Sequence, residues 1–257
     1  MHETVDVTDV DPLRSGIAVV VLVAIAVLAA RVGRVSISRD VVVATVRAAV
    51  QLAAVAVVIA WVFRHPEGTA VYLGVMVVAA AVTASRRIGL SGTAALGTAV
   101  AIVAGALAAV VPVLASGALE LGAQTVLPFT AQIIGGAMTA TSLAGLRLRD
   151  EAVQDWGQVE AWLSIGATPR QALAPSVRVA VSRAIFPATD QTRSAGLVTL
   201  PGAFVGLLLG GASPAEAAEV QLLVLVGLLA AEAVAAVVVT RLLAPGFGRV
   251  RPETVPR

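Results

Sequence analysis

The chain has 257 residues, of which 58% are hydrophobic and only 13% are charged, and its mean hydropathy is +0.92. Soluble domains carry about 25% charged residues, so this composition indicates a membrane protein. All 18 basic residues are arginine, which excludes a Walker-type nucleotide loop because that loop needs a lysine. The chain has no cysteine and two histidines, which excludes thiolate chemistry and Cys/His zinc sites. Apolar blocks separate the arginines, so nucleic acid is not an expected partner.

Seven apolar blocks are candidates for membrane-spanning helices, since a span takes about 20 mainly apolar residues to cross roughly 30 Å of hydrocarbon. The blocks are Leu13 to Ala30, Val41 to Phe63, Thr69 to Ala84, Ile88 to Ala115, Val126 to Leu146, Ser194 to Gly211 and Ala217 to Thr240. The residues before the first block are acidic, unlike the basic start of a cleaved signal peptide, so we expect this span to be retained. We expect an all-α polytopic membrane protein with about seven transmembrane helices, a single domain over residues 1–257, and a cytoplasmic loop at about 147–193.

The arginines lie on alternate sides of these blocks. Fifteen of the 18 follow the first, third, fifth or last block, and the exceptions are Arg14, Arg47 and Arg64. Basic loops stay in the cytoplasm, so the pattern predicts a plasma (inner) membrane protein with its N-terminus outside and its C-terminus in the cytoplasm. This arrangement requires an odd number of spans.

The loop at about 147–193 contains a polar stretch with helical periodicity. Its apolar residues recur at steps near three and four between Asp150 and Ile165, which predicts an amphipathic helix. Gly166 is expected to end this helix, because glycine tolerates the left-handed conformation of a helix C-terminus. Thr168 can cap the next helix and Pro169 fits its first turn. The segment is therefore predicted to be a stiff helix–corner–helix unit joined to membrane helices at both ends.

The spacing of Glu160, Ala161 and Gly166 is that of the loop by which ABC permeases dock a coupling helix into their ATPase. The alternative is a helix resting on the membrane surface, which Trp156 and Trp162 favour. The polar face of the helix is mostly acidic and anionic lipid repels it, so we prefer docking. The residues assigned to ATPase coupling are Glu160, Ala161, Gly166, Ala167, Thr168, Pro169 and Arg170.

Several motifs occur in one order along the chain. They are T-V-R-A-A-V-Q-L (45–52), G-G-A-M (135–138), L-S-I-G-A-T-P-R-Q-A (163–172), A-G-L-V-T-L-P-G (195–202), and G-x-x-P-x-x-A (211–217) with Gln221. Over about residues 40 to 240 the chain resembles the FetB-type permease family of bacterial iron-export ABC permeases and plant aluminium-tolerance relatives. The resemblance implies a non-catalytic permease subunit that works as a homodimer with two copies of a separate ABC ATPase. ATP and Mg²⁺ would bind that partner, and this chain would bind no cofactor.

Two positions depart from the usual pattern of that family. Gly136 stands where the family often has asparagine in the G-x-A-M motif, and Ala203 and Phe204 stand where it often has a methionine pair. These positions therefore lack the amide and thioether groups that a soft metal could contact.

Polar residues within the apolar blocks are costly there, so each needs a reason. Glu232 and Gln221 are eleven residues apart, about three helical turns, and share a face. Either they line a path for substrate or protons, or Glu232 is paired with an arginine or a backbone group for packing. Arg47 and Gln51 share a face of the second block, where Arg47 either snorkels to the headgroups or contacts substrate. Met138 is interpreted as packing or as a soft metal contact.

Hinge and packing positions are expected around the sixth block. Pro187 should lead into it, and Pro201 should kink it by removing a hydrogen bond. Gly202, Gly206 and Gly210 form a ridge of small residues that lets another helix approach closely. The ridge serves either motion or static packing.

The sequence thus favours the permease subunit of an ABC transporter, an exporter of a metal ion such as iron, embedded in the lipid bilayer. A proton-coupled secondary transporter using Glu232 and a membrane scaffold for another cytosolic protein remain alternatives. An intramembrane enzyme is disfavoured, because the blocks contain no histidine base and Ser142 has no evident activating partner.

Overall fold

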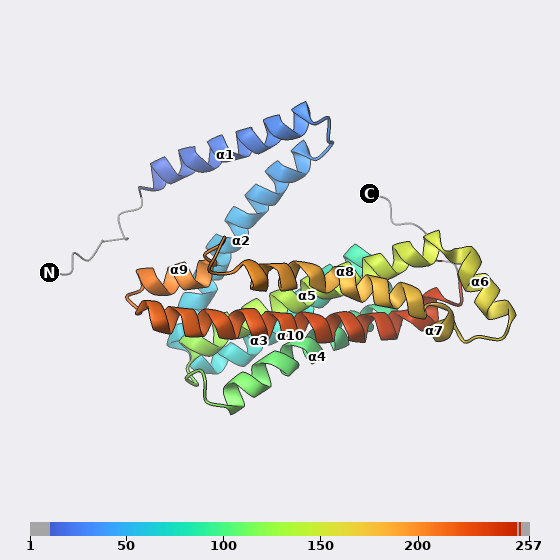
Figure 1. Cartoon of the computed structure of the whole chain (residues 1–257). Coiled ribbons are helices and arrows are strands. Elements are labelled where there is room, and N and C mark those ends of the chain that lie inside the picture. Colours follow the sequence, from blue (N-terminus) through green and yellow to red (C-terminus); the bar gives the residue numbers. More distant parts are fainter. Residues whose placement is uncertain (1–10, 251, 253–257) are drawn as a thin grey trace. The chain divides into compact units, whose positions relative to one another are not determined.

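The computed structural model describes residues 11–250 and 252, and most of these residues lie in helices (Figure 1). No strand is present among them, so the predicted all-α fold is confirmed. The chain divides into two compact units, Met1–His65 and Pro66–Arg257, each of which is described by itself. The expectation of one membrane domain stays a prediction.

The first unit is a pair of apolar helices, α1 (Pro12–Val32) and α2 (Ser38–Arg64). The carboxylate of Asp11 caps α1 by accepting a hydrogen bond from the backbone N–H of Leu13 at 2.9 Å. The two helices pack together, but only Ala30 and Val62 are buried. The large aliphatic side chains of this unit are mostly exposed, as expected of helices that face lipid.

The second unit is a helical bundle. Its elements are the 3₁₀ turn η1 (Pro66–Gly68), α3 (Thr69–Ile88), α4 (Thr93–Ala115), α5 (Ala123–Gln154), α6 (Trp156–Ser164), α7 (Pro169–Ala172), α8 (Ala174–Ser194), α9 (Gly202–Leu209) and α10 (Pro214–Phe247). The long helices α5 and α10 form its centre, and each packs against the other, α4 and α8. Contacts between residues show that α3, α5 and α10 run in one direction and that α4 and α8 run in the other.

Small residues bring the helices of this bundle close together. A Cβ added at Gly105 of α4 would lie 2.5 Å from the backbone oxygen of Ala231 in α10 and 3.0 Å from the Cβ of Ala235. The core around these contacts is rich in alanine. Close approach through glycine and alanine is the usual packing mode of helices in a bilayer, where burial of apolar surface gives no driving force.

Six helices of the described chain are long and apolar enough to cross a membrane: α1, α2, α3, α4, α5 and α10. The predicted sixth span, Ser194 to Gly211, is wrong as a single helix. The chain leaves helical conformation between Ser194 and Gly202, where Gly196 has a φ of +82° and Pro201 offers no backbone N–H. The remaining helix, α9, has only 8 residues.

The predicted cytoplasmic loop at 147–193 is also wrong in its second half, since residues 174–194 form α8. This helix has 21 residues and packs against both α5 and α10, with its start near the end of α10 (Figure 1). Hydropathy does not identify α8 as part of the bundle because it carries four charged residues. Only residues 155–173, which contain α6 and α7, connect the two bundle helices at that end.

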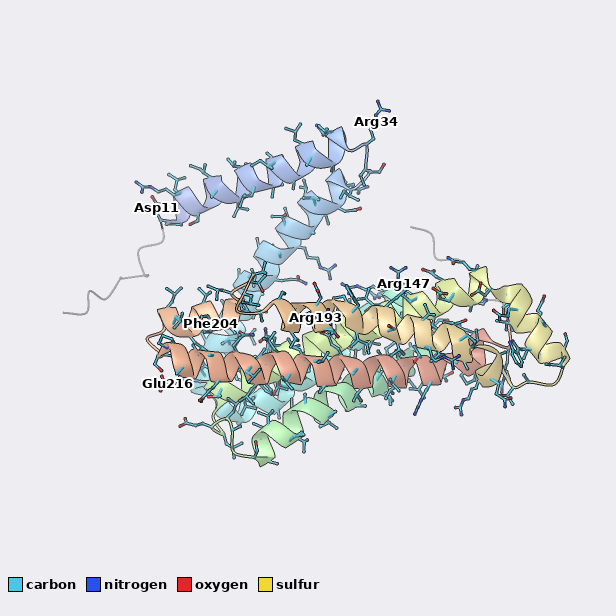
Figure 2. The ribbon with its side chains drawn as sticks, in the orientation of Figure 1. Asp11, Arg34, Arg147, Arg193, Phe204 and Glu216 are labelled. Atoms are coloured by element: carbon cyan, nitrogen blue, oxygen red, sulfur yellow. The ribbon has the colours of Figure 1, made fainter. Side chains whose placement is uncertain are left out.

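The arginines of the second unit gather at one end of the bundle, which we call the basic end. Here α3, α5 and α10 finish and α8 begins. Its arginines are Arg86, Arg87, Arg147, Arg149, Arg170, Arg178, Arg183, Arg241 and Arg249. Arg193, which was expected on the same side, lies near the other end of α8. Figure 2 shows Phe204 and Glu216 where α9 and the start of α10 lie, and Arg147 nearer the basic end.

Candidate functional site

The segment between α5 and α8 is the first candidate site. The helix predicted over 150–165 is in fact divided, because residues 150–154 continue α5 and α6 begins after Asp155. The predicted start of this helix at residue 150 was therefore wrong. No helix-breaking residue lies before residue 150, so the membrane helix α5 continues without interruption into the amphipathic segment. Val159 anchors α6 in the core and is 1% exposed.

The corner between α6 and α7 has the predicted chemistry. Gly166 adopts a φ of +90° and donates its backbone N–H to the oxygen of Leu163, which ends α6. Thr168 caps α7 in a capping box with Gln171, and Pro169 occupies the first turn. The backbone N–H of Thr168 donates to Oε1 of Gln171 at 2.8 Å. Local hydrogen bonds therefore hold this corner in one conformation.

The outer surface of this corner is available for contact. Trp162 is 44% exposed and Ile165 is 76% exposed. Glu160 is exposed as well, and its carboxylate accepts a hydrogen bond from Nε1 of Trp156 at 2.7 Å. Exposed apolar side chains and an oriented carboxylate on one short segment are suited to a protein partner.

The corner is fixed to the bundle on its inner side. Pro169 packs against the end of α10, since a Cβ added at Gly248 would lie 2.8 Å from the Cβ of Pro169. Arg183 of α8 forms an ion pair with Glu151 of α5 at 2.8 Å. Force applied to α6 and α7 would therefore reach α5, α8 and α10.

The second candidate site lies at the opposite end of α8. The side-chain Oε1 of Gln221 in α10 accepts a hydrogen bond from the backbone N–H of Phe204 at 3.1 Å. Gln221 is 6% exposed. Its hydrogen bond caps the N-terminus of α9, where Pro201 at the N-cap position has no polar side chain to do so. The predicted kink at Pro201 was wrong: the helix is interrupted before this residue and starts again after it.

A cavity of about 240 Å³ lies beside this hydrogen bond. It is lined by Thr192, Ala195, Gly196, Leu200, Pro201, Phe204, Ala218, Gln221, Leu222 and Leu225. The adjoining Leu197 and Val198 are 90% and 83% exposed. The A-G-L-V-T-L-P-G motif therefore forms a turn that presents apolar side chains next to a small cavity.

The predicted glycine ridge has no partner helix within the described chain. Added Cβ atoms at Gly202 and Gly206 would meet nothing within 4 Å, and one at Gly210 would approach only backbone of its own turn. Pro187 lies inside α8, and the expected transition into a span at this residue was wrong. The proline can still bend α8, since its ring removes one helical hydrogen bond.

Glu232 lies in the middle of α10 and is half-buried. Its side chain packs against Gly136 of α5, where an added Cβ would lie 3.0 Å from Oε1 of Glu232 and 2.5 Å from Leu228. Gln132 and Thr139 are exposed one turn before and after Gly136 on α5. A glycine at position 136 thus makes room for the carboxylate in an otherwise apolar region.

Within the second unit, the other predicted path residues do not join this group. Met138 is half-buried and packs into the hydrophobic core. Gln221 is about 16 Å from Glu232 along the axis of α10 and is already hydrogen-bonded to α9. Arg47 and Gln51 are exposed and lie in α2, in the other unit.

The sequence interpretation missed the polar face of α8. Its exposed or half-buried polar residues are Arg178, Ser182, Arg183, Thr189, Asp190, Gln191, Thr192, Arg193 and Ser194. The signal that could have identified it is a repeat of small residues every four positions, and these are the buried Ser176, Ala180, Ala184 and Ala188. Such a repeat is typical of helices that pack closely in a membrane.

The donor groups that could bind a metal ion are dispersed over the described residues. Among the described residues, no group of three or more His, Asp or Glu side chains could together hold a metal ion.

Comparison with known proteins identifies a family and several relatives that each match most of the chain. Residues 14–247 match the family described as "Uncharacterised protein family (UPF0014)". The chain is 32% identical over 233 residues to the UPF0014 membrane protein STAR2 of Oryza sativa subsp. japonica, covering 90% of this chain and 82% of that protein. It is 29% identical over 219 residues to the "Probable iron export permease protein FetB" of Escherichia coli (strain K12), covering 84% and 85%. It is 28% identical over 241 residues to the UPF0014 membrane protein YjkA of Bacillus subtilis (strain 168), covering 91% and 94%. No solved structure matches the chain.

Proposed function

The chain belongs to the UPF0014 family of membrane proteins, and from this premise we propose that it is the permease subunit of an ABC transporter that exports a metal ion. Iron is the candidate cargo because one relative carries the name of an iron export permease. The chain itself performs no chemistry in this proposal. A separate ATPase binds ATP and Mg²⁺ and drives transport.

The observation that carries the proposal is the α6–α7 corner. It is stiffened by the Thr168 capping box, packed against the end of α10 and joined by the chain to α5 and α8 on one side, and exposed at Trp162 and Ile165 on the other. A segment with these properties can transmit movement of a bound partner. Resting on anionic lipid is disfavoured, since Asp155 and Glu160 would face that surface.

The proposed path for the cargo follows the polar residues in the second half of α8, which are Thr189, Asp190, Thr192 and Arg193. Charged and hydroxyl side chains that project from a bundle at membrane depth need water or other polar groups around them. In a homodimer, two such faces could enclose an aqueous passage with Asp190 and Glu232 as its carboxylates. Two permease chains and two ATPase chains form the proposed assembly.

The arginine distribution sets the proposed orientation. Nine arginines occupy the basic end, so this end faces the cytoplasm together with α6, α7 and the C-terminus. The corner then lies where a cytosolic ATPase can reach it. The N-terminus lies outside.

The test is co-purification of the full-length chain with a candidate ATPase, followed by iron-stimulated ATP hydrolysis in liposomes. Glu160→Arg should reduce complex formation and stimulation at least tenfold, because it reverses the charge of the exposed carboxylate that Trp156 orients. Gly166→Pro should do the same, since proline cannot adopt a φ of +90°. Glu219→Arg is the matched control, because Glu219 is also exposed but lies in the first turns of α10, away from the basic end.

Wild-type binding and stimulation in both corner variants would refute the coupling role. Iron export that continues without any ATPase, and stops in Glu232→Gln, would instead indicate a proton-coupled transporter.

A further inference from the structure

A cavity at the basic end is surrounded by arginines from three elements. It has a volume of about 500 Å³ and lies between α7, α8 and α10. Its lining residues are Arg170, Ala174, Val177, Arg178, Arg241 and Ala244. Each arginine of the set is supplied by a different helix, so the fold brings together three positive charges that are far apart in the sequence.

No carboxylate of the described chain neutralises these charges. The ion pairs among the described residues join Arg14 to Asp11 and Arg183 to Glu151, and neither involves the cavity. Three guanidinium groups around one hollow repel one another, and an anion between them removes that repulsion. Guanidinium groups bind phosphate especially well because their N–H groups match two of its oxygens.

The arginine-lined cavity continues into an apolar groove between α8 and α10. The groove has a volume of about 460 Å³ and shares Val177, Arg178 and Arg241 with the cavity. Its other lining residues are Val181, Ser182, Ile185, Val237 and Thr240. The hydroxyl of Thr240 already donates to the backbone oxygens of Ala236 and Val237, so this side chain presents mainly its methyl group. The groove suits a hydrocarbon chain.

We propose that the cavity and groove form a binding site for an anionic phospholipid. The phosphate lies among Arg170, Arg178 and Arg241, and one acyl chain lies in the groove between α8 and α10. The arginines lie at a depth in the bilayer that suits a lipid headgroup. Arg241 lies about 36 Å along α10 from Ala217, and this distance exceeds the roughly 30 Å thickness of the hydrocarbon core. Basic pockets between membrane helices on the cytoplasmic side are known to hold anionic headgroups.

This site requires only that the bundle spans a bilayer, and it stands whether or not an ATPase drives transport. Where the coupling proposal also holds, the lipid connects α7 with α8 and α10 directly behind the exposed corner. The bound lipid would then stiffen the attachment of the corner to the bundle.

The test is native mass spectrometry of the purified full-length chain titrated with dioleoyl phosphatidylglycerol or dioleoyl phosphatidylcholine. One phosphatidylglycerol per chain should bind at least tenfold more tightly than phosphatidylcholine. The double variant Arg178→Gln/Arg241→Gln should weaken phosphatidylglycerol binding about 30-fold, from roughly fivefold for each arginine. The matched control Arg86→Gln/Arg147→Gln removes two exposed arginines from the same end but outside the cavity, and should change binding less than threefold.

The groove is tested separately. Ser182→Trp places a bulky side chain in the groove and should weaken phosphatidylglycerol binding about tenfold while leaving glycerophosphoglycerol, the headgroup alone, unaffected. Arg178→Lys/Arg241→Lys keeps the charge and should retain most of the binding, which controls for folding. Equal loss in the control and cavity double variants, or equal binding of both lipids, would overturn the proposal. Full displacement of the lipid by inorganic phosphate at equal concentration would assign the cavity to free phosphate instead.

Discussion

The closest approach between α4 and α10 allows a quantitative test of the fold. Gly105 has no Cβ, and an added one would lie 2.5 Å from the backbone oxygen of Ala231. A relaxed carbon–oxygen contact is about 3.3 Å. In Gly105→Ala the two helices must therefore separate by about 0.8 Å, because a backbone oxygen inside a helix cannot rotate away as the end of a side chain can.

The expected cost follows from two opposing effects. Overpacking of a rigid contact costs about 1–3 kcal/mol, and the upper part of this range applies because the obstructing atom is backbone. Alanine favours a helix by about 1 kcal/mol relative to glycine, which offsets part of that cost. We expect Gly105→Ala to reduce the free energy of unfolding by about 2 kcal/mol, equivalent to a Tm about 4–8 °C lower for a chain of this size.

The assay is thermal unfolding of the purified protein in one detergent, with Gly135→Ala as the matched control. Gly135 is also in a helix interior, but an added Cβ would meet nothing within 4 Å. Its Tm should stay the same or rise by up to about 4 °C, since only the helix propensity changes. A Tm for Gly105→Ala equal to or above that of Gly135→Ala would refute the close packing of α4 on α10.

Three further variants test the two candidate sites and the half-buried carboxylate of Glu232. Gln221→Leu removes the cap of α9, and hydrogen exchange at the amide of Phe204 should become about tenfold faster, from a loss of about 1.4 kcal/mol. An unchanged rate there would mean that the hydrogen bond contributes nothing. Thr168→Ala should destabilise α7 by about 1 kcal/mol and speed exchange at the amide of Gln171 about fivefold, whereas Thr168→Ser should not. Glu232→Gln should lower ATP-driven iron export about tenfold with normal ATPase binding, measured in liposomes, and full export would exclude this carboxylate from the path.

Local chemistry made the corner between α6 and α7 predictable. Gly166, Thr168 and Pro169 each act through their own backbone or a partner three residues away, so their roles follow from the sequence alone. The capping box has the same character, because Gln171 sits at the position that a capping threonine requires. The predicted ends and caps at this corner were therefore confirmed.

Predictions that depended on distant contacts were less successful. Residues 194–211 are apolar but turn at Gly196 and Pro201, whereas residues 174–194 are polar and yet lie in the bundle. Hydropathy measures only average affinity for lipid, while α8 is held by its small residues against α5 and α10. Arg193 was assigned to the basic side because residues up to 193 were expected to form a loop there, whereas they belong to α8. The pairing of Gly136 with Glu232 was also invisible, since it joins positions 96 residues apart.

The placement of α8 connects the two candidate sites mechanically. The helix starts at the capped corner beside Pro169 and reaches Thr192, which lines the cavity next to Gln221. The hydrogen-bonded backbone of α8 resists compression, so a displacement of α7 is carried along the axis of α8 to the turn at 195–201 and to α9. The first turn of α9 is in turn hydrogen-bonded to Gln221 of α10. The exposed Pro187 is the point at which the helix can bend, because the helical hydrogen bond is missing there. A partner that moves the corner therefore acts on the far cavity through one helix, and the polar face of that same helix borders the proposed path.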